Sequence, residues 1–575
     1  MTTISPRLTY NDFFEDQISI NHLLKGFTKN DLFRISSLLN SKVKQNQSST
    51  DTVSDWFSST ETKTALIQKI EKNNSHIINT YSNLTLLSYI TYCDDTEASM
   101  ISDDFELKLF KIYLLINSQQ DLIENKNLLK NDDLETKEKL SASLLKMSYH
   151  TYDLDNYILH EVFLCQLIKS IEFFRYIETN LNNHLKLFLQ KYNCDDWQEW
   201  VKKLLNIIIP IINHDDSTFS EIRLDERNDD ETGTFLELFR RNIELSEKPD
   251  FIVLRSNPLY KHSSSTYIVI NKLFLIERIF KSLTFEFSLE INNEVAVKWK
   301  VKDFRAEFCN NFSEETLFYK LIENSFPKNP RFKKISGVAF KNARYNTGEP
   351  DYYVRFKNKV LLFESKDVIL KGEEKQSRNY LTLKEALEKK FLKTTKDGGQ
   401  VENKAILQLI SNIERIFTKY YNTLDSDYDE NTVKIYPYLV THDRQFDTPE
   451  LNRLLNSWFK EEKEKVFNPE EQKRICDLTV LNIDSILLNQ EAFRKRGHNG
   501  LEVLTKNYHN YLKPTSMSTV DKIGQQYLDT SLSFHTYLGR YFDNTERSKP
   551  PFINEYLEFL KLDEKVKSRK NYKRK

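Results

Sequence analysis

Apolar residues recur at helical spacing through the first part of the chain. Segments 104–115 and 158–169 carry apolar positions three or four residues apart, which is the period of one helix face. No proline lies between Pro6 and Pro210, and the stretch between them holds a single glycine, so helix-interrupting residues are scarce. We therefore predict a mostly helical recognition or regulatory region over residues 1–245, with these stripes as its core.

The pattern changes after an acidic stretch at 214–231, whose irregular spacing is typical of a solvated linker rather than a calcium loop. Short apolar runs at 251–255 and 266–270 predict buried strands. Residues 283–299 alternate apolar and polar positions around a central Asn-Asn pair, which predicts a hairpin. We expect a small α+β connector over residues 246–305.

Strand-like and helix-like patterns then alternate over residues 306–515. Helices are expected at 311–325, 382–391, 401–417, 448–458 and 484–494, and strands at 332–340, 352–356, 360–363, 433–440 and 478–483. A helical segment with a basic tail follows at 516–575. The fold class is therefore α+β and multidomain, with a helical N-terminal region followed by an α/β core. The tail can either grip phosphates or keep the chain soluble.

Between residues 349 and 366, acidic residues interrupt strand-like sequence. Their spacing is typical of acids that meet at an active site. If Lys357 and Asn358 form a two-residue loop, the flanking strands pair as a hairpin. That register places Asp351 directly opposite Glu364, and Glu349 opposite Lys366. All four side chains then share one face of the hairpin.

Directly opposed residues have Cβ atoms about 4.5–5.5 Å apart, so the Asp351 and Glu364 carboxylates would repel each other. A divalent cation between them removes that repulsion. Lys366 lies two residues beyond Glu364 on the same face, where its amine can orient or activate a water bound to the metal. The pattern thus predicts a metal-dependent hydrolytic site.

The pair Pro350-Asp351 and the triplet Glu364-Ser365-Lys366 resemble the motif of the PD-(D/E)XK nuclease superfamily. The resemblance spans residues 311–496. It implies a restriction-endonuclease-like α/β core with a mixed sheet, Mg²⁺ (or Mn²⁺) as cofactor, and DNA as substrate. Asp351 and Glu364 would be metal ligands, Lys366 would act on the water, and the Ser365 carbonyl would add a ligand.

Two further site residues follow from the same resemblance. Glu315, in the helix before the core strands, fits a glutamate that often reaches the metal in this superfamily, with Glu323 as second choice. Gln408 fits a glutamine on the helix after the lysine strand that touches the site. For Glu315 the alternative is helix-dipole complementarity, and for Gln408 a solvated helix face.

Composition limits the other classes of function. A formal net charge of -1 does not favour a general nucleic-acid binder, so DNA contact would need local basic patches. Five widely separated cysteines argue against a disulfide framework or a zinc ribbon. Without a secretory pattern at the start or a long apolar run, we expect a cytoplasmic protein with no membrane partner.

The combined expectation is a Mg²⁺-dependent DNA endonuclease. A helical sensor joined to a nuclease resembles bacterial restriction or phage-defence effectors, with a second copy or a defence protein as partner. Two alternatives stay open at this point. One is a non-catalytic scaffold with a degenerate nuclease fold, and the other is a nuclease directed at RNA.

Overall fold

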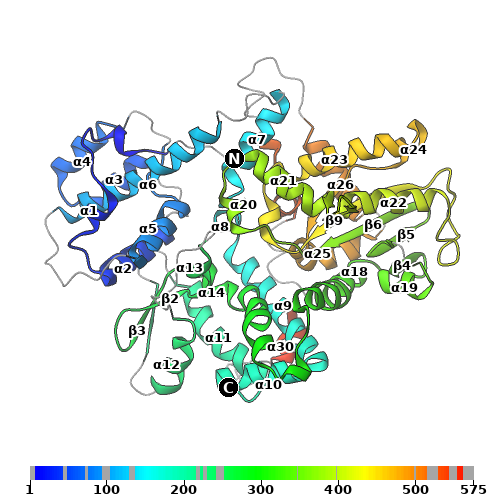
Figure 1. Cartoon of the computed structure of the whole chain (residues 1–575), viewed down its shortest axis with the longest axis horizontal. Coiled ribbons are helices and arrows are strands. Elements are labelled where there is room, and N and C mark those ends of the chain that lie inside the picture. The colour runs from blue at the N-terminus through cyan, green and yellow to red at the C-terminus, as the bar shows by residue number, and fades with distance from the viewer. Residues whose placement is uncertain are drawn as a thin grey trace, which may run out of the picture. The chain divides into compact units, whose positions relative to one another are not determined.

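The structure is a computed structural model of the chain (Figure 1). It describes residues 7–42, 48–70, 75–92, 104–128, 136–214, 220–224, 229–240, 251–345, 348–396, 398–497, 500–513, 529–542 and 553–560. Helices predominate and one mixed five-stranded sheet is present, so the expected α+β class is confirmed. Within the described ranges no helix is long and apolar enough to cross a membrane. The basic tail lies outside them.

The chain forms two compact units. The first comprises Met1–Asp133, Leu154–Gln166 and Leu189–Glu286, and the second comprises Leu134–Asp153, Leu167–Phe188 and Phe287–Lys575. Each unit draws on separate stretches of sequence, whereas the four expected domains are consecutive. That consecutive division stays a prediction.

The first unit is mainly helical, as the scarcity of helix breakers predicts. Its elements are η1 (Tyr10–Asp12), α1 (Ile20–Leu24), α2 (Lys29–Lys42), α3 (Ser49–Trp56), α4 (Thr60–Ile67), α5 (Thr80–Tyr92), α6 (Phe105–Leu128), α11 (Trp197–Ile212), α12 (Asp229–Glu237), α13 (Ile252–Ser256), α14 (Lys272–Glu277) and α15 (Lys281–Glu286). Three short antiparallel strands, β1 (Glu221–Arg223), β2 (Leu259–Lys261) and β3 (Thr266–Val269), pair in the order β1-β3-β2. The strand expected at 251–255 is wrong, since α13 occupies it.

The hairpin expected at 283–299 is also wrong, because its apolar residues are buried at helical and not at alternating spacing. Leu283 and Phe287, four residues apart, are fully buried, whereas Phe285 and Leu289 are 41% and 65% exposed. A strand would have buried all four on one face. The segment instead forms the end of α15, then η4 (Phe287–Ile291), α16 (Asn292–Glu294) and η5 (Val297–Trp299).

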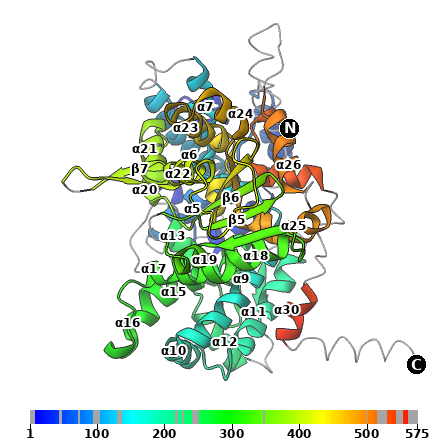
Figure 2. The same cartoon turned by 90° about the vertical axis from the view of Figure 1, so that its right-hand side faces the viewer.

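The second unit is built around a mixed sheet in the order β10-β9-β6-β5-β4. Its strands are β4 (Phe332–Ser336), β5 (Tyr352–Phe356), β6 (Lys359–Lys366), β9 (Lys434–Thr441) and β10 (Thr479–Asn482). β4, β5 and β6 are antiparallel, while β6, β9 and β10 are parallel. In Figures 1 and 2, helix α22 (Ala405–Phe417) lies on one side of β6, and α18 (Tyr319–Ser325) lies on the other.

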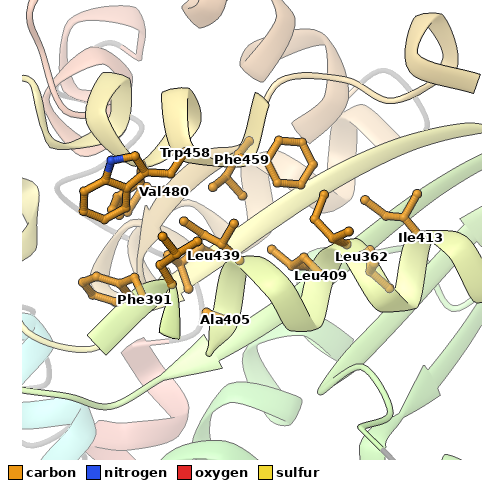
Figure 3. Close-up of a cluster of buried hydrophobic side chains, with 14 of the residues drawn as sticks. Leu362, Phe391, Ala405, Leu409, Ile413, Leu439, Trp458, Phe459 and Val480 are labelled. Atoms are coloured by element: carbon orange, nitrogen blue, oxygen red, sulfur yellow. The ribbon is translucent and has the colours of Figure 1, made fainter. Parts of the chain in front are cut away.

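The face of the sheet under α22 holds the main core of this unit. Leu362 and Leu439 of the sheet meet Leu409 and Ile413 of α22, and Trp458 of α23 (Leu451–Val466) closes the same cluster (Figure 3). Each of these five side chains is at least 95% buried. The apolar stripe expected within 401–417 therefore packs as predicted, although the helix starts at Ala405.

Aromatic residues pack the opposite face of the sheet. Phe363 stacks on Tyr438 with ring centroids 4.9 Å apart, and Phe318 packs edge-on against Tyr352 at 6.1 Å. Both faces are therefore covered, which explains why β5 and β6 are apolar on both sides.

The second unit holds further helices, some of them shared with the first unit. They are α7 (Thr136–Ser148), α8 (Tyr152–Asp155), α9 (Leu159–Asn180), α10 (Asn182–Tyr192), α17 (Phe304–Glu307), η6 (Phe308–Phe318), α19 (Gly337–Asn342), α20 (Gly372–Gln376), α21 (Tyr380–Phe391), η7 (Arg444–Asp447), α24 (Pro469–Arg474), α25 (Ile483–Arg496), α26 (Leu501–Tyr511), α28 (Phe534–Tyr541) and α30 (Ile553–Phe559), and α8, α9 and α10 contribute to both units. The strand expected at 332–340 ends at Ser336, because the Ser336 hydroxyl caps α19 by accepting the Ala339 N–H.

Candidate active site

The β5–β6 hairpin has the register that the sequence predicts. Lys357 and Asn358 form the two-residue loop, with Lys357 at φ 53°, and Tyr352 pairs with Phe363 at the other end of the ladder. One position further, Asp351 and Glu364 lie opposite each other. The backbone hydrogen-bond ladder ends there. In its place the Ser365 N–H donates to the Asp351 side chain, at Oδ2 and 2.6 Å.

The face on which the acidic residues lie follows from strand alternation. Leu362 and Tyr353 belong to the core under α22. Glu364 and Lys366 continue the Leu362 side of β6, and Asp351 continues the Tyr353 side of β5. The three polar side chains therefore stand at the end of the core face, where β6 stops.

Glu364 is 1% exposed and holds the centre of this cluster. Its Oε1 accepts a hydrogen bond from Lys366 Nζ at 2.5 Å, while its buried Oε2 has no hydrogen-bond partner in the part of the chain that the structure describes. Burial and the nearby Asp351 charge raise the pKa of Glu364 to about 8. Burial also raises the pKa of Asp351, although Lys366 and the Ser365 N–H oppose that shift.

Lys366 carries the positive charge that partly balances these acids. Burial favours its neutral amine, but the negative charges of Glu364 and Asp351 outweigh burial and raise the pKa of Lys366. Its side chain keeps 22% exposure. A lysine held in the charged form can donate hydrogen bonds to a water or a phosphate oxygen and does not serve as a base.

Glu314 is a third acid that faces this cluster. It lies in η6, a π-helix, and accepts a hydrogen bond from the Tyr319 hydroxyl at 2.9 Å. Burial and the Asp351 charge raise the pKa of Glu314 to about 7, and its charge in turn raises the pKa of Glu364. The three carboxylates therefore share one electrostatic environment.

The structure does not bring Glu315 or Glu323 to this cluster. Glu315 is exposed, and Glu323 accepts from the Tyr352 hydroxyl on the aromatic face and pairs with Lys334 at 2.5 Å. The wider hydrogen-bond register of η6 explains the one-residue difference from the expected glutamate. The Tyr319 N–H bonds the Glu314 carbonyl, five residues back, so regular α-helical spacing misplaces the inward-facing position.

Gln408 lies half-buried on α22, one turn from its start, and its buried Oε1 finds no hydrogen-bond partner among the described residues. It shares a stripe with Asn412 and Arg415. Arg415 Nη1 donates to the Gly348 carbonyl at 2.6 Å, so this stripe faces the segment that leads into Asp351. The expected solvated helix face does not describe Gln408.

Ser365 turns its side chain away from the acids, toward the aromatic face. Its Oγ is 2.8 Å from Nε2 of His442, and burial lowers the pKa of His442 to about 4. Behind the histidine, Asp367 accepts from Ser313 Oγ at 2.5 Å and from Arg305 Nη2 at 2.6 Å. Although burial opposes it, His442 and Arg305 lower the pKa of Asp367. The residue that binds Asp351 is thus itself fixed by a polar network.

Sequence reasoning missed Glu314, His442 and Asp367. The adjacent pair Glu314-Glu315 was the available signal for Glu314. Regular α-helical spacing turns Glu315 toward the site, whereas the π-helix turns Glu314 toward it. Glu349 also departs from expectation. Its carboxylate lies 3.6 Å from Lys341 Nζ, beyond the end of the β5–β6 ladder, and no pairing with Lys366 is formed in the described part of the chain.

The described residues contain no set of three or more His, Cys, Asp or Glu side chains arranged as a ready metal cage. The fit to a cation rests on other features. Glu364 Oε2 is buried and has no hydrogen-bond partner among the described residues. Burial, followed by the repulsion of nearby like charges, raises the pKa values of Glu364 and Glu314. A hard divalent cation bound by carboxylate oxygens would relieve both conditions.

No protein-family model, curated protein or solved structure matches the chain. Function is therefore inferred from the chemistry of these residues alone. Acids held near a lysine at the end of a central strand can bind a hard cation, position a water and neutralise a phosphate.

Proposed function

We propose that the chain is a Mg²⁺-dependent phosphodiester hydrolase that cuts DNA. One observation carries the proposal, namely the convergence of Asp351, Glu364 and Lys366 on one face at the end of the β5–β6 hairpin. A buried oxygen of Glu364 there has no hydrogen-bond partner within the described ranges. Strongly shifted carboxylates with a specific charged neighbour are typical of functional sites.

Each residue has a distinct role in this proposal. Asp351 and Glu364 would hold Mg²⁺ or Mn²⁺, with the Ser365 carbonyl as a further ligand and Glu314 in reach of a bound water. The metal ion, when bound, polarises the phosphate and lowers the pKa of a coordinated water. Lys366 would orient the attacking water or contact a phosphate oxygen. Gln408, as the resemblance implies, would accept a hydrogen bond from the same water.

The order of elements supports the resemblance to PD-(D/E)XK nucleases without deciding it. A helix, an antiparallel β4–β5–β6 meander, a helix and a parallel β9 follow one another as that superfamily implies. We further propose that the chain is a restriction or phage-defence effector that acts in the cytoplasm, with the helical region over residues 1–245 as the module that selects the target. That part rests on architectural analogy.

The decisive experiment compares matched glutamates. Purified E364Q is incubated with plasmid DNA in Mg²⁺ and in EDTA beside the parent chain, with E323Q as control because Glu323 lies away from Asp351. We expect Mg²⁺-dependent cutting by the parent and E323Q, and its loss in E364Q. Cutting by E364Q at the parental rate would overturn the proposal.

Calorimetry separates the enzyme from a scaffold with incidental charges. We expect a Mg²⁺ or Mn²⁺ site in the parent that D351N lacks, and no heat of binding in either protein if the hairpin is scaffold only. Running the cleavage assay on RNA of the same sequence tests the RNA-directed alternative.

A further inference from the structure

A two-stranded ribbon separates the helices α21 and α22. It consists of β7 (Lys393–Thr395) and β8 (Val401–Asn403), paired antiparallel with Lys393 opposite Asn403 and Thr395 opposite Val401. The Lys404 N–H donates to the Leu392 carbonyl at 2.9 Å, which closes the base of the ribbon. Figure 2 shows the strand labelled β7 extending away from α21 and α22.

The ribbon meets the rest of the described chain at its base, where Thr394 Oγ1 donates to the Lys389 carbonyl of α21 at 2.7 Å. From Lys393 to Lys404, every described residue is exposed or half-buried, and Val401 is 54% exposed. Added Cβ atoms at Gly398 and Gly399 would meet no atom within 4 Å. An isolated two-stranded hairpin is marginally stable in water, so an ordered ribbon with no core of its own suggests an external partner.

The base of the ribbon is basic, which suits a nucleic-acid contact. The ribbon itself, residues 393–403, holds two lysines and two acidic residues, and three further lysines flank its base: Lys389 and Lys390 at the end of α21, and Lys404 directly after β8. Glu402 pairs with both Lys396 and Lys404, at 3.3 and 2.9 Å, while Lys393 has no ion-pair partner among the described residues. Thr, Gln and Asn side chains fill the remaining polar positions. Such residues bind phosphates and base edges.

The position of the ribbon relative to the site follows from chain direction. β6 ends at Lys366, and β9 begins beside the start of β6, since Lys434 pairs with Lys359. Helix α22 must therefore run back from the Lys366 end of the sheet, and its first residue, Ala405, follows the ribbon directly. The ribbon thus leaves the molecule at the end of the sheet where Asp351 and Glu364 lie.

We propose that the β7–β8 ribbon enters the major groove of B-form duplex DNA and holds the duplex against the carboxylate site, a proposal that rests on the nuclease function above. Neighbouring strands lie about 4.8 Å apart, and the B-DNA major groove, about 12 Å wide, admits a two-stranded ribbon. The major groove of A-form RNA is too narrow and deep for it. The ribbon therefore selects duplex DNA over duplex RNA.

The test uses the full chain and labelled 30-base-pair duplexes of DNA and RNA, with binding measured by fluorescence anisotropy in EDTA so that nothing is cut. The variant K393E/K396E is compared with K465E/K473E, which makes the same charge change at lysines of α23 and α24 that are 64% and 69% exposed. We expect the ribbon variant to lose at least about tenfold in affinity for duplex DNA, and its salt slope to fall by about two. The control should bind within about twofold of the parent.

Several results would overturn the ribbon proposal. Parental binding by K393E/K396E, an equal loss in the control pair, equal affinity of the parent for duplex RNA, or a change in self-association in place of DNA affinity would each do so. Thermal melting checks folding, and both variants should melt with the parent because all four substituted lysines are exposed. The two proposals can fail separately. If the parent and the ribbon variant bind DNA as expected but E364Q still cuts DNA, the nuclease proposal is wrong and the ribbon proposal is not.

Discussion

The backbone N–H of Ser365 donates to Asp351 Oδ2 at 2.6 Å, across the end of the β5–β6 hairpin. This contact replaces the next rung of the ladder, so the aspartate is held by the strand that carries Glu364 and Lys366. Because His442 holds the Ser365 hydroxyl from the opposite face, both faces of the sheet fix the position of Asp351. An acid held this firmly is preorganised for a bound cation.

Two adjacent glutamates provide a matched pair of substitutions. We expect E314Q to lower Mg²⁺-dependent DNA cutting by about 10- to 100-fold, because Glu314 faces Asp351 and Glu364, and E315Q to cut like the parent. Initial rates of plasmid nicking at saturating Mg²⁺ measure both. Equal rates for the two variants, or a larger loss in E315Q, would mean that η6 does not supply a residue to the site.

Replacing Gln408 should raise the stability of the protein and lower its activity. Leaving a buried acceptor unpaired costs about 1–3 kcal/mol, so Q408L should raise the free energy of unfolding by about 1 kcal/mol in EDTA while lowering the cutting rate. Urea denaturation and the nicking assay are the two readouts. A destabilised Q408L with parental activity would indicate that the amide has only a structural role.

How far the site could be predicted from sequence depends on the kind of structure involved. The positions of Asp351 and Glu364 were predictable because a two-residue loop sets every later pair in a hairpin, even though Lys357 must adopt a positive φ. The choice between Glu314 and Glu315 was not, because a π-helix is not encoded in apolar spacing. His442 was not predictable either. It directly follows β9, and it reaches Ser365 because β9 pairs in parallel with β6.

The fold shows the same division. Long amphipathic segments such as α22 were predicted because burial follows the 3.6-residue period closely. At 283–299 the alternation of apolar residues misled, since tertiary packing buried Leu283 and Phe287 and left Phe285 and Leu289 exposed. Short segments with apolar residues on every side satisfy both periods, and the surroundings decide between them.

A buried ion pair should anchor the hairpin independently of the site. Asp425 accepts from Arg355 Nε at 2.5 Å, from Arg355 Nη2 at 2.7 Å and from the Tyr353 hydroxyl at 2.8 Å. D425A removes the buried carboxylate that holds the Arg355 charge and leaves the guanidinium only the exposed Asp427 as an ion-pair partner in the described chain, so we expect it to lower the free energy of unfolding by about 3 kcal/mol. D427A is the control, because Asp427 is 80% exposed and 3.7 Å from the same guanidinium. Comparable losses in both variants would contradict this role of Asp425.

Metal binding should release protons near neutral pH. Since the pKa of Glu364 is about 8 and that of Glu314 about 7, the metal-free site retains protons at pH 7 that a divalent cation must displace. We expect the affinity for Mn²⁺ to rise from pH 6 to pH 8.5. Calorimetry in two buffers of different ionisation enthalpy should detect the released proton at pH 7, and E364Q should release fewer. An affinity independent of pH would contradict the raised pKa values.

Asp447 should make stability fall as pH rises. Burial, followed by the charges of Asp484 and Asp443, raises its pKa well above the usual value, although Arg444 and Lys169 oppose the shift. The native state therefore keeps a proton that the unfolded chain loses at a pH of about 4, so native stability declines from that pH upward until the folded carboxyl ionises. Because D447N cannot ionise, its stability relative to the parent should increase between pH 4 and pH 8 in urea denaturation.

Asp429 provides a control of opposite sign for this experiment. The Asn431 N–H and the Thr432 hydroxyl lower its pKa, so its contribution to stability is complete above the unfolded pKa and is lost as pH falls through the folded one. D429N should therefore lose stability relative to the parent at neutral pH and recover it in acid, the reverse of D447N. If both variants track the parent at every pH, the Asp447 carboxyl does not hold its proton in the native state.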